Sequence, residues 1–236
     1  MSQPAPRNRT GNRLLDRLPP DESSRLLALA ETVSLRPLEE LHRQDSPLPH
    51  VYFPKSGVLS SVIALGEGRV VEAATVGNEG MVSIPALLGL DFTSATATSQ
   101  VPGDSLRIPT PSFVQAIQRS GPLDLILRRY IAFSLRSAYQ AVACNALHAA
   151  EERMSRWLLT TQDRVGKGEF LLTQEFLAEM LGVRRQTVQV VAGTLQTAGL
   201  ITYRRGLVRV VDREGLEAAS CECYGSIKAL YDRIVR

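Results

Sequence analysis

Residues 172–195 read LTQEFLAEMLGVRRQTVQVVAGTL, and this stretch decides how the C-terminal part of the chain folds. Two amphipathic helical patterns lie on either side of Gly182. The Thr173 hydroxyl can cap the first helix, and glycine permits the sharp turn that ends it. The apolar positions that face inward are Phe176, Leu177, Met180, Leu181, Val188, Val191 and Leu195. The pattern predicts two short helices joined by a tight turn, a helix-turn-helix.

The outward face of the second helix carries side chains suited to DNA bases. Arginine can form a bidentate pair with guanine, and glutamine can do so with adenine. Residues 180–211 include no acid, so a local positive field suits a polyanion there. A strand over 198–203, the basic glycine turn 204–206 and a returning strand over 207–211 predict a wing that contacts phosphate. The predicted DNA-contacting residues are Thr173, Arg184, Arg185, Gln186, Thr187, Gln189, Arg204 and Arg205.

Upstream, residues 123–165 contain neither proline nor glycine, which predicts one or two long helices. A 4-3-4-3 spacing, typical of the narrow seam by which two helices pack along each other, is followed by Ile131, Leu135, Ala138, Val142 and Asn145. Either this face covers the β-rich region, or it packs against a second copy of the chain. The predicted dimer-interface residues are Leu127, Ile131, Leu135, Ala138 and Val142. A second amphipathic segment begins at Glu151.

The N-terminal half has the texture of an antiparallel sandwich or barrel, with short β-rich runs separated by Pro, Gly and Ser clusters. The runs are HVYFP (50–54), GVLSSVIAL (57–65), RVVEAATV (69–76), TSATATSQV (93–101) and DSLRIP (104–109). Residues 65–69 predict a hairpin turn. Residues 1–13 predict a disordered tail, and Pro19-Pro20-Asp21-Glu22 predicts the start of a helix that continues into SSRLLALAETV (23–33).

The composition excludes some protein classes. Apolar residues make up 44% and charged residues 22% of the 236 positions, as in ordinary soluble domains. No apolar stretch approaches the ~20 residues of a membrane helix, and the polar N-terminus resembles no secretory leader. Three cysteines are too few for a disulfide framework. These features predict a cytoplasmic protein with no membrane contact.

A β-roll, a long helix and a winged helix-turn-helix, in this order, resemble the Crp/Fnr superfamily of bacterial transcription regulators. The resemblance covers about residues 14–225 and is most specific in EERMSRWLL (151–159) and over 172–211. It implies an α+β fold with these parts: a tail (1–13), an antiparallel β-roll (jelly-roll) sensor domain like those that bind cyclic nucleotides (14–120), a dimerisation helix (121–145) and a winged helix-turn-helix DNA-binding domain (146–236).

The same resemblance implies a homodimer that binds a pseudo-palindromic site on double-stranded DNA, with RNA polymerase as a further partner. The arginine with which the family reads guanine falls on Arg185. Gln186 stands where relatives often carry glutamate, so the base preferred at that step stays open. Arg184 and Thr187 are the expected phosphate contacts.

The resemblance places an effector pocket in residues 76–81 and 93–95, and its candidate residues are Gly77, Glu79, Gly80, Met81, Thr93 and Ser94. Thr93 stands where cyclic-nucleotide binders have an arginine. Without a guanidinium, a buried cyclic phosphate would lack its charge partner. Arg69 and Arg107 are expected to be exposed strand residues rather than replacements. We therefore expect no cyclic AMP binding, and the effector is unidentified.

No metal site, cofactor or catalytic centre is predicted. An iron–sulfur cluster normally needs four cysteines. Cys144 is expected to pack as a small apolar side chain, and the Cys221-x-Cys223 pair is expected to be incidental rather than a redox pair. The three histidines, His42, His50 and His148, form no short ligand motif.

Two alternatives to an effector-responsive regulator stay open. One is a constitutive DNA-binding regulator with a vestigial sensor domain. The other is a β-roll enzyme, which would need a His/Glu metal cluster or a nucleophile motif that the β-rich region lacks.

Overall fold

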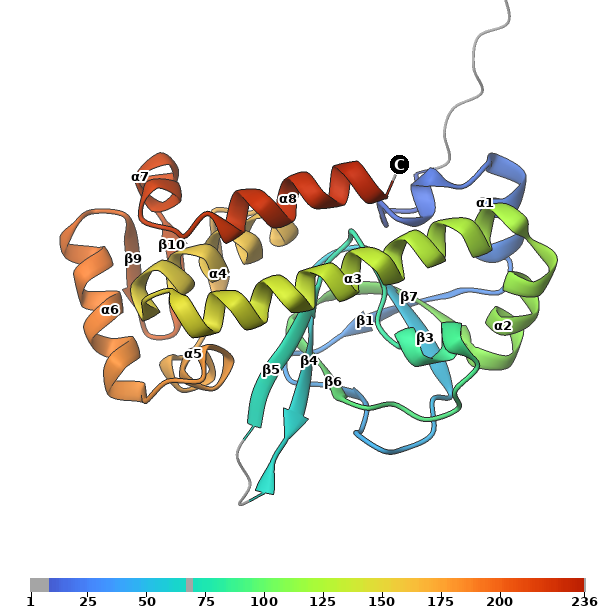
Figure 1. The fold of residues 1–236 in the computed structure, drawn as a ribbon, viewed down its shortest axis with the longest axis horizontal. Coiled ribbons are helices and arrows are strands. Elements are labelled where there is room, and N and C mark those ends of the chain that lie inside the picture. Colours follow the sequence, from blue (N-terminus) through green and yellow to red (C-terminus); the bar gives the residue numbers. More distant parts are fainter. Residues whose placement is uncertain (1–8, 67–69, 236) are drawn as a thin grey trace, which may run out of the picture.

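The structure, a computed structural model, describes residues 9–66 and 70–235. Figure 1 shows a strand-rich N-terminal domain, the long helix α3 beside it, and a smaller helical C-terminal domain at the other end of α3. The expected α+β class and the order of β-roll, long helix and helix-turn-helix are confirmed.

The β-roll consists of two antiparallel sheets. One has the order β1 (Glu31–Leu35), β7 (Gly103–Pro109), β3 (His50–Pro54); the other has the order β2 (Glu40–His42), β6 (Thr96–Val101), β4 (Val58–Ala64), β5 (Val70–Val76). All five expected runs contain strands. The pairing of Ala64 with Val70 confirms the hairpin, although residues 67–69 of its turn, Arg69 included, lie outside the described residues.

Short helices close the roll: η1 (Leu15–Arg17), α1 (Pro20–Leu27), η3 (Ile84–Leu88) and α2 (Thr110–Arg119). Phe53 and Phe113 meet edge to face at 5.6 Å between ring centroids in the core of this domain. The expected helix start at Pro20 is confirmed, but the helix ends at Leu27. Residues 31–33 belong instead to β1, because they pair with β7.

The expected disordered tail (1–13) is wrong for residues 9–13, and residues 1–8 lie outside the described residues. Thr10 and Asn12 are buried, and the Asn12 side-chain amide donates hydrogen bonds to the carbonyls of Pro54 and Gly80, each at 2.8 Å. The Asn12 Oδ1 in turn accepts from the amides of Leu14 and Leu15. One asparagine thus satisfies four backbone groups, which fixes a segment whose composition looks disordered.

Helix α3 (Gly121–Leu147) and helix α4 (Ala150–Val165) form the long helical stretch, and the chain is extended between them at His148 and Ala149. The long helix ends two residues later than the expected 121–145. None of the described helices is both long and apolar enough to span a membrane.

The C-terminal domain contains β8 (Glu169–Leu171), α5 (Gln174–Leu181), α6 (Arg185–Thr197), β9 (Ile201–Arg204), β10 (Leu207–Val210) and α7 (Arg213–Ala218). Met154, Trp157 and Leu158 of α4 are buried in its core. The strands pair in the order β8-β10-β9, so the predicted wing is confirmed.

A last helix, α8 (Cys223–Ile234), does not belong to this domain. It runs back along α3 toward the N-terminal segment (Figure 1). Tyr231 and Val235 are buried in the core of the β-roll domain, where the Tyr231 ring meets Phe133 of α3 at 5.2 Å. The expected domain 146–236 is therefore too long at its C-terminal end, because apolar residues of α8 are buried against the sensor domain.

Candidate DNA-binding surface and sensor cavity

Local hydrogen bonds hold the two helices of the helix-turn-helix in place. The Thr173 Oγ1 accepts from the Phe176 amide at 3.1 Å and caps α5. Gly182 has φ +63°, which allows the turn, and the Val183 amide donates to the Ala178 carbonyl at 3.0 Å across it. The predicted roles of Thr173 as a helix cap and of Gly182 as the turn residue are confirmed.

Helix α6 is anchored on one side and open on the other. Val188, Val191 and Leu195 are buried. Four of the predicted DNA-contacting residues around its N-terminus are exposed and one, Thr187, is half-buried; the exposed ones are Arg184, Arg185, Gln186 and Gln189. This is the arrangement a recognition helix needs, since its N-terminal side chains must reach into the groove.

The wing projects beside this helix. Arg205 and Gly206 both have left-handed backbone conformations, with φ +50° and +78°, which closes the turn between β9 and β10 tightly. Arg204 and Arg205 are exposed there. Tyr203 fixes the wing to the domain, because its hydroxyl donates to the Leu172 carbonyl at 2.7 Å.

A cavity of about 300 Å³ lies between β5, α3 and α4, on the side of the roll that faces the C-terminal domain. Of the six candidate effector residues, Glu79, Met81, Thr93 and Ser94 line it. Gly77 and Gly80 do not. They lie where a Cβ would clash with the Arg164 side chain and with the Tyr130 ring, respectively, so their role is close packing.

The cavity has no arginine from the described part of the roll. The Thr93 hydroxyl donates to the Ala95 carbonyl at 2.9 Å, and Arg107 is engaged in an ion pair with Glu31 at 2.6 Å on the outer surface. The two arginines that line the cavity, Arg156 and Arg164, come from α4 instead.

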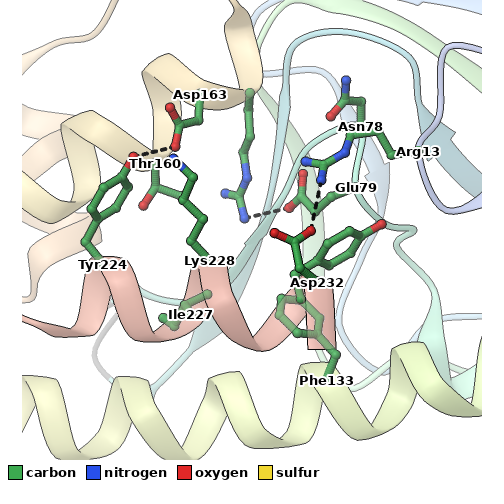
Figure 2. Close-up of a pocket in the computed structure, with 12 residues that line it drawn as sticks. Arg13, Asn78, Glu79, Phe133, Thr160, Asp163, Tyr224, Ile227, Lys228 and Asp232 are labelled. Atoms are coloured by element: carbon green, nitrogen blue, oxygen red, sulfur yellow. Dashed lines mark hydrogen bonds and ion pairs between the residues drawn. The ribbon is translucent and has the colours of Figure 1, made fainter. Parts of the chain in front are cut away.

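Arg164 joins the two domains. Its guanidinium forms an ion pair with Glu79 at 2.7 Å, and both side chains are nearly buried. The same guanidinium donates to the Thr75 carbonyl at 2.9 Å and to the Thr75 hydroxyl. Figure 2 shows Glu79 facing a second pocket, of about 280 Å³, that Lys228 and Asp232 of α8 line. Glu79, expected to meet an effector, is thus already paired within the chain.

Glu72 of β5 forms a second interdomain contact. Its carboxylate accepts from the Trp157 indole at 3.1 Å and from the Ser60 hydroxyl at 3.0 Å. Burial raises the Glu72 pKa to about 7, and these hydrogen bonds, with Arg164 and Arg156, only partly oppose that rise. Sequence patterns did not single out Glu72, because an acid on a strand is normally exposed.

The Glu72 pKa predicts a pH-dependent contact. Because the folded-state pKa is raised, the protonated Glu72 carboxyl stabilises the folded state. This stabilisation is fully present below about pH 4.5 and is lost as the pH rises through about 7. The change is at most about 3 kcal/mol in the free energy of unfolding. Denaturant unfolding followed by the single tryptophan, Trp157, measures it. Glu72→Gln should remove this dependence of the unfolding free energy on pH, and the exposed control Glu214→Gln should keep it. An unchanged pH dependence in Glu72→Gln would contradict the raised pKa of Glu72.

Comparisons with known proteins agree with this geometry. A family model of the cyclic nucleotide-binding domain matches residues 32–120, and a model of the Crp-like helix-turn-helix domain matches residues 152–219. The chain belongs to the Crp/Fnr family of transcription regulators. A comparison with curated proteins finds no significant match.

Solved structures share the fold of this Crp/Fnr regulator. FixK2 from Bradyrhizobium japonicum is 21% identical with a TM-score of 0.68, covering 81% of this chain and 98% of its own. A putative Crp/Fnr regulator from Eubacterium rectale is 18% identical with a TM-score of 0.68, covering 89% and 98%. The regulator CLP of Xanthomonas campestris, described as responsive to c-di-GMP, is 17% identical with a TM-score of 0.66, covering 80% and 98%.

The expected dimer seam of the regulator is only partly on the surface of α3. Leu135 is 52% and Val142 70% exposed, and Ala138 is exposed beside them. Ile131 is half-buried. Leu127 is 2% exposed and lies in the core of its own β-roll domain, so its assignment to the interface is wrong. The predicted seam extends one turn too far toward the N-terminus of α3, because the first turns of this helix are buried against the β-roll.

The cysteines lie closer together than expected. Cys144 of α3 is buried, but its Sγ lies only 3.6 Å from the Sγ of Cys221. Cys223 and His148 complete the group, and all four ligand atoms lie within 4.8 Å of one another. The expected packing of Cys144 as a small buried side chain is confirmed, but the sequence did not predict that Cys221, Cys223 and His148 lie beside it. Sequence spacing gave no signal for this group, because His148 lies just beyond the end of α3 and 77 positions separate Cys144 from Cys221.

Proposed function

We propose that this Crp/Fnr regulator acts as a homodimer on a pseudo-palindromic DNA site. The observation that carries the proposal is the uncovered apolar face of α3, where Leu135, Tyr139 and Val142 are each at least half exposed. Helix α8 packs on the opposite side of α3, through contacts such as that of Gln140 with Cys223. A helix that is apolar on both sides needs a second partner, and a second α3 is the one whose seam matches.

Binding-site selection from a random DNA pool tests this function directly. A two-fold dimer should enrich two inverted half-sites about one helical turn apart. Enrichment of a single unsymmetrical site, or of none, contradicts the proposal. In the proposed complex, Arg185 and Gln189 contact base edges. The phosphate contacts come from Arg184, Thr187, Arg204 and Arg205. RNA polymerase would be contacted by the regulator bound at a promoter.

The effector would act through the contacts that join the two domains. The cavity contains the acids Glu72 and Glu79 and the arginines Arg156 and Arg164, and the arginines come from the DNA-binding side. A ligand with an anionic group can compete with Glu79 for Arg164 and so change how α4 sits on the roll. Charged side chains of both signs line this cavity and are available to a charged ligand, which favours a sensor over a vestigial domain.

Cyclic AMP is not the effector we expect. Thr93 supplies no charge, and its hydroxyl is already hydrogen-bonded to Ala95. Millimolar cyclic AMP should leave both the melting temperature and the DNA affinity unchanged. A ligand at a hundredfold excess over its dissociation constant would add about 2.7 kcal/mol to the free energy of unfolding, which thermal unfolding detects readily. Saturable stabilisation by cyclic AMP would contradict the placement of Thr93.

A constitutive regulator with a vestigial sensor is the second candidate. The closed Arg164–Glu79 pair favours it, because it joins the domains without any ligand. Arg164→Gln separates the two candidates. It should change the affinity for the selected site if interdomain contact controls binding, and leave that affinity unchanged if the domain is vestigial.

A further inference from the structure

Four potential metal ligands converge where α3 ends and α8 begins. Cys144 lies in the last turn of α3 and His148 directly follows that helix, while Cys221 and Cys223 lie where α8 begins. The three thiols are free cysteines and are buried, and they form a small cluster of their own apart from the domain cores. Their convergence depends on the fold, since 77 positions separate Cys144 from Cys221.

The separations fit a single tetrahedral ion. Cys144 Sγ lies 3.6 Å from Cys221 Sγ, and Cys223 Sγ lies 3.6 Å from His148 Nδ1. Ligands of tetrahedral zinc, with Zn–S about 2.3 Å and Zn–N about 2.0 Å, are about 3.5–3.8 Å apart. All four atoms lie within 4.8 Å of one another, a spacing that suits one ion and is too small for the core of a multi-iron cluster.

The surroundings orient the ligands, which is independent support for a site. Glu222 Oε2 lies 3.2 Å from His148 Nε2. A proton on Nε2 directed at this carboxylate leaves the Nδ1 lone pair facing the thiols, as in carboxylate–histidine–zinc arrangements. The Gln140 side-chain amide also donates to Cys223 Sγ at 3.1 Å, a bond that favours the thiolate.

Nearby groups also offset the charge that a metal centre would carry. Cys223 is the first residue of α8, where the helix dipole favours an anion. Burial raises the pKa of the Cys144 thiol, and the Arg156 guanidinium opposes that rise.

We propose that Cys144, His148, Cys221 and Cys223 bind one zinc ion. Three thiols lose their protons to solvent on binding, and three thiolates with one neutral imidazole leave the centre with a single net negative charge. Cys₃His is a donor set of structural zinc sites. The ion would join the C-terminal end of α3 to the start of α8, beside the extended hinge at His148 and Ala149 that connects the sensor to the DNA-binding domain.

The test uses the full-length, reduced protein. Elemental analysis of protein purified without chelator should find about one zinc ion per chain. After chelator treatment, titration with Co²⁺ should give a thiolate charge-transfer band in the near ultraviolet and intense visible bands typical of tetrahedral cobalt, saturating at the same stoichiometry. Zinc should then displace the cobalt and remove the bands.

Variants distinguish this site from adventitious binding. Cys221→Ser should lose the stoichiometric metal, and the control His50→Gln should retain it. Glu222→Gln removes no ligand but should weaken zinc affinity by roughly 10- to 100-fold, so it remains informative if a cysteine variant does not fold. Metal retained in Cys221→Ser overturns the proposal. A wild-type protein that binds neither metal after reduction, or whose Cys144 and Cys221 are found by mass spectrometry to be joined as a disulfide that excludes metal, also overturns it.

Discussion

Leu135→Asp is expected to convert the proposed dimer into a monomer and to abolish tight binding to the operator. The Leu135 side chain is 52% exposed at the centre of the apolar seam of α3. A two-fold interface contains each substitution twice. Losing two leucines from such an interface costs about 3–6 kcal/mol per dimer, which weakens association roughly 10²- to 10⁴-fold. Two carboxylates brought face to face add to this cost.

Sedimentation velocity over a range of protein concentrations measures the effect, and operator affinity should fall with it because a monomer engages one half-site. Leu125→Asp is a matched control. Leu125 is also 52% exposed on α3 but lies roughly 80° around the helix axis from Leu135. The control should remain dimeric. A dimer that survives Leu135→Asp places the interface elsewhere.

Arg185→Ala and Arg205→Ala are expected to weaken DNA binding in different ways. Arg185 is the first residue of α6 and is exposed where a recognition helix meets base edges. A bidentate guanine contact contributes roughly 1–3 kcal/mol of discrimination, so its loss should flatten the preference at one half-site position by about 5- to 150-fold. Arg205 sits at the tip of the wing and should contact phosphate, which adds affinity without sequence preference.

Competition binding with single-base operator variants, repeated at a series of salt concentrations, separates the two roles. Arg205→Ala should lower affinity equally for all sequences and reduce the salt slope by about one. Arg185→Ala should change the ranking of sequences. If Arg185→Ala lowers affinity uniformly and every base preference persists, α6 is not the recognition helix in the register assigned to it.

Local patterns were sufficient for much of the fold. The helix-turn-helix could be predicted because its parts are close in sequence, from the Thr173 cap through Gly182 to the wing turn at Arg205. The β-rich runs were predictable for the same reason, since alternating apolar residues and turn-forming residues act within a few positions. In both regions, hydrogen bonds and burial follow from neighbouring residues.

Prediction was less accurate where one segment is stabilised by another far along the chain. The polar composition of residues 9–13 does not reveal that Asn12 binds the carbonyls of Pro54 and Gly80. Leu127 fits a seam by its spacing, but the roll buries it first. Glu72 looks like an exposed strand acid until Trp157 donates a hydrogen bond to it.

The sequence by itself therefore determined the family, the DNA-reading helix with its wing, and the order of the domains, because each depends on periodicity and capping within short windows. Only the tertiary structure decided which groups meet between domains. In the folded chain, Arg164 forms an ion pair with Glu79. Helix α8 packs along α3, which places Cys221 and Cys223 beside Cys144 and His148. Such contacts depend on how whole elements pack, and the identity of a single ion pair or thiol cluster leaves no periodic trace in the chain.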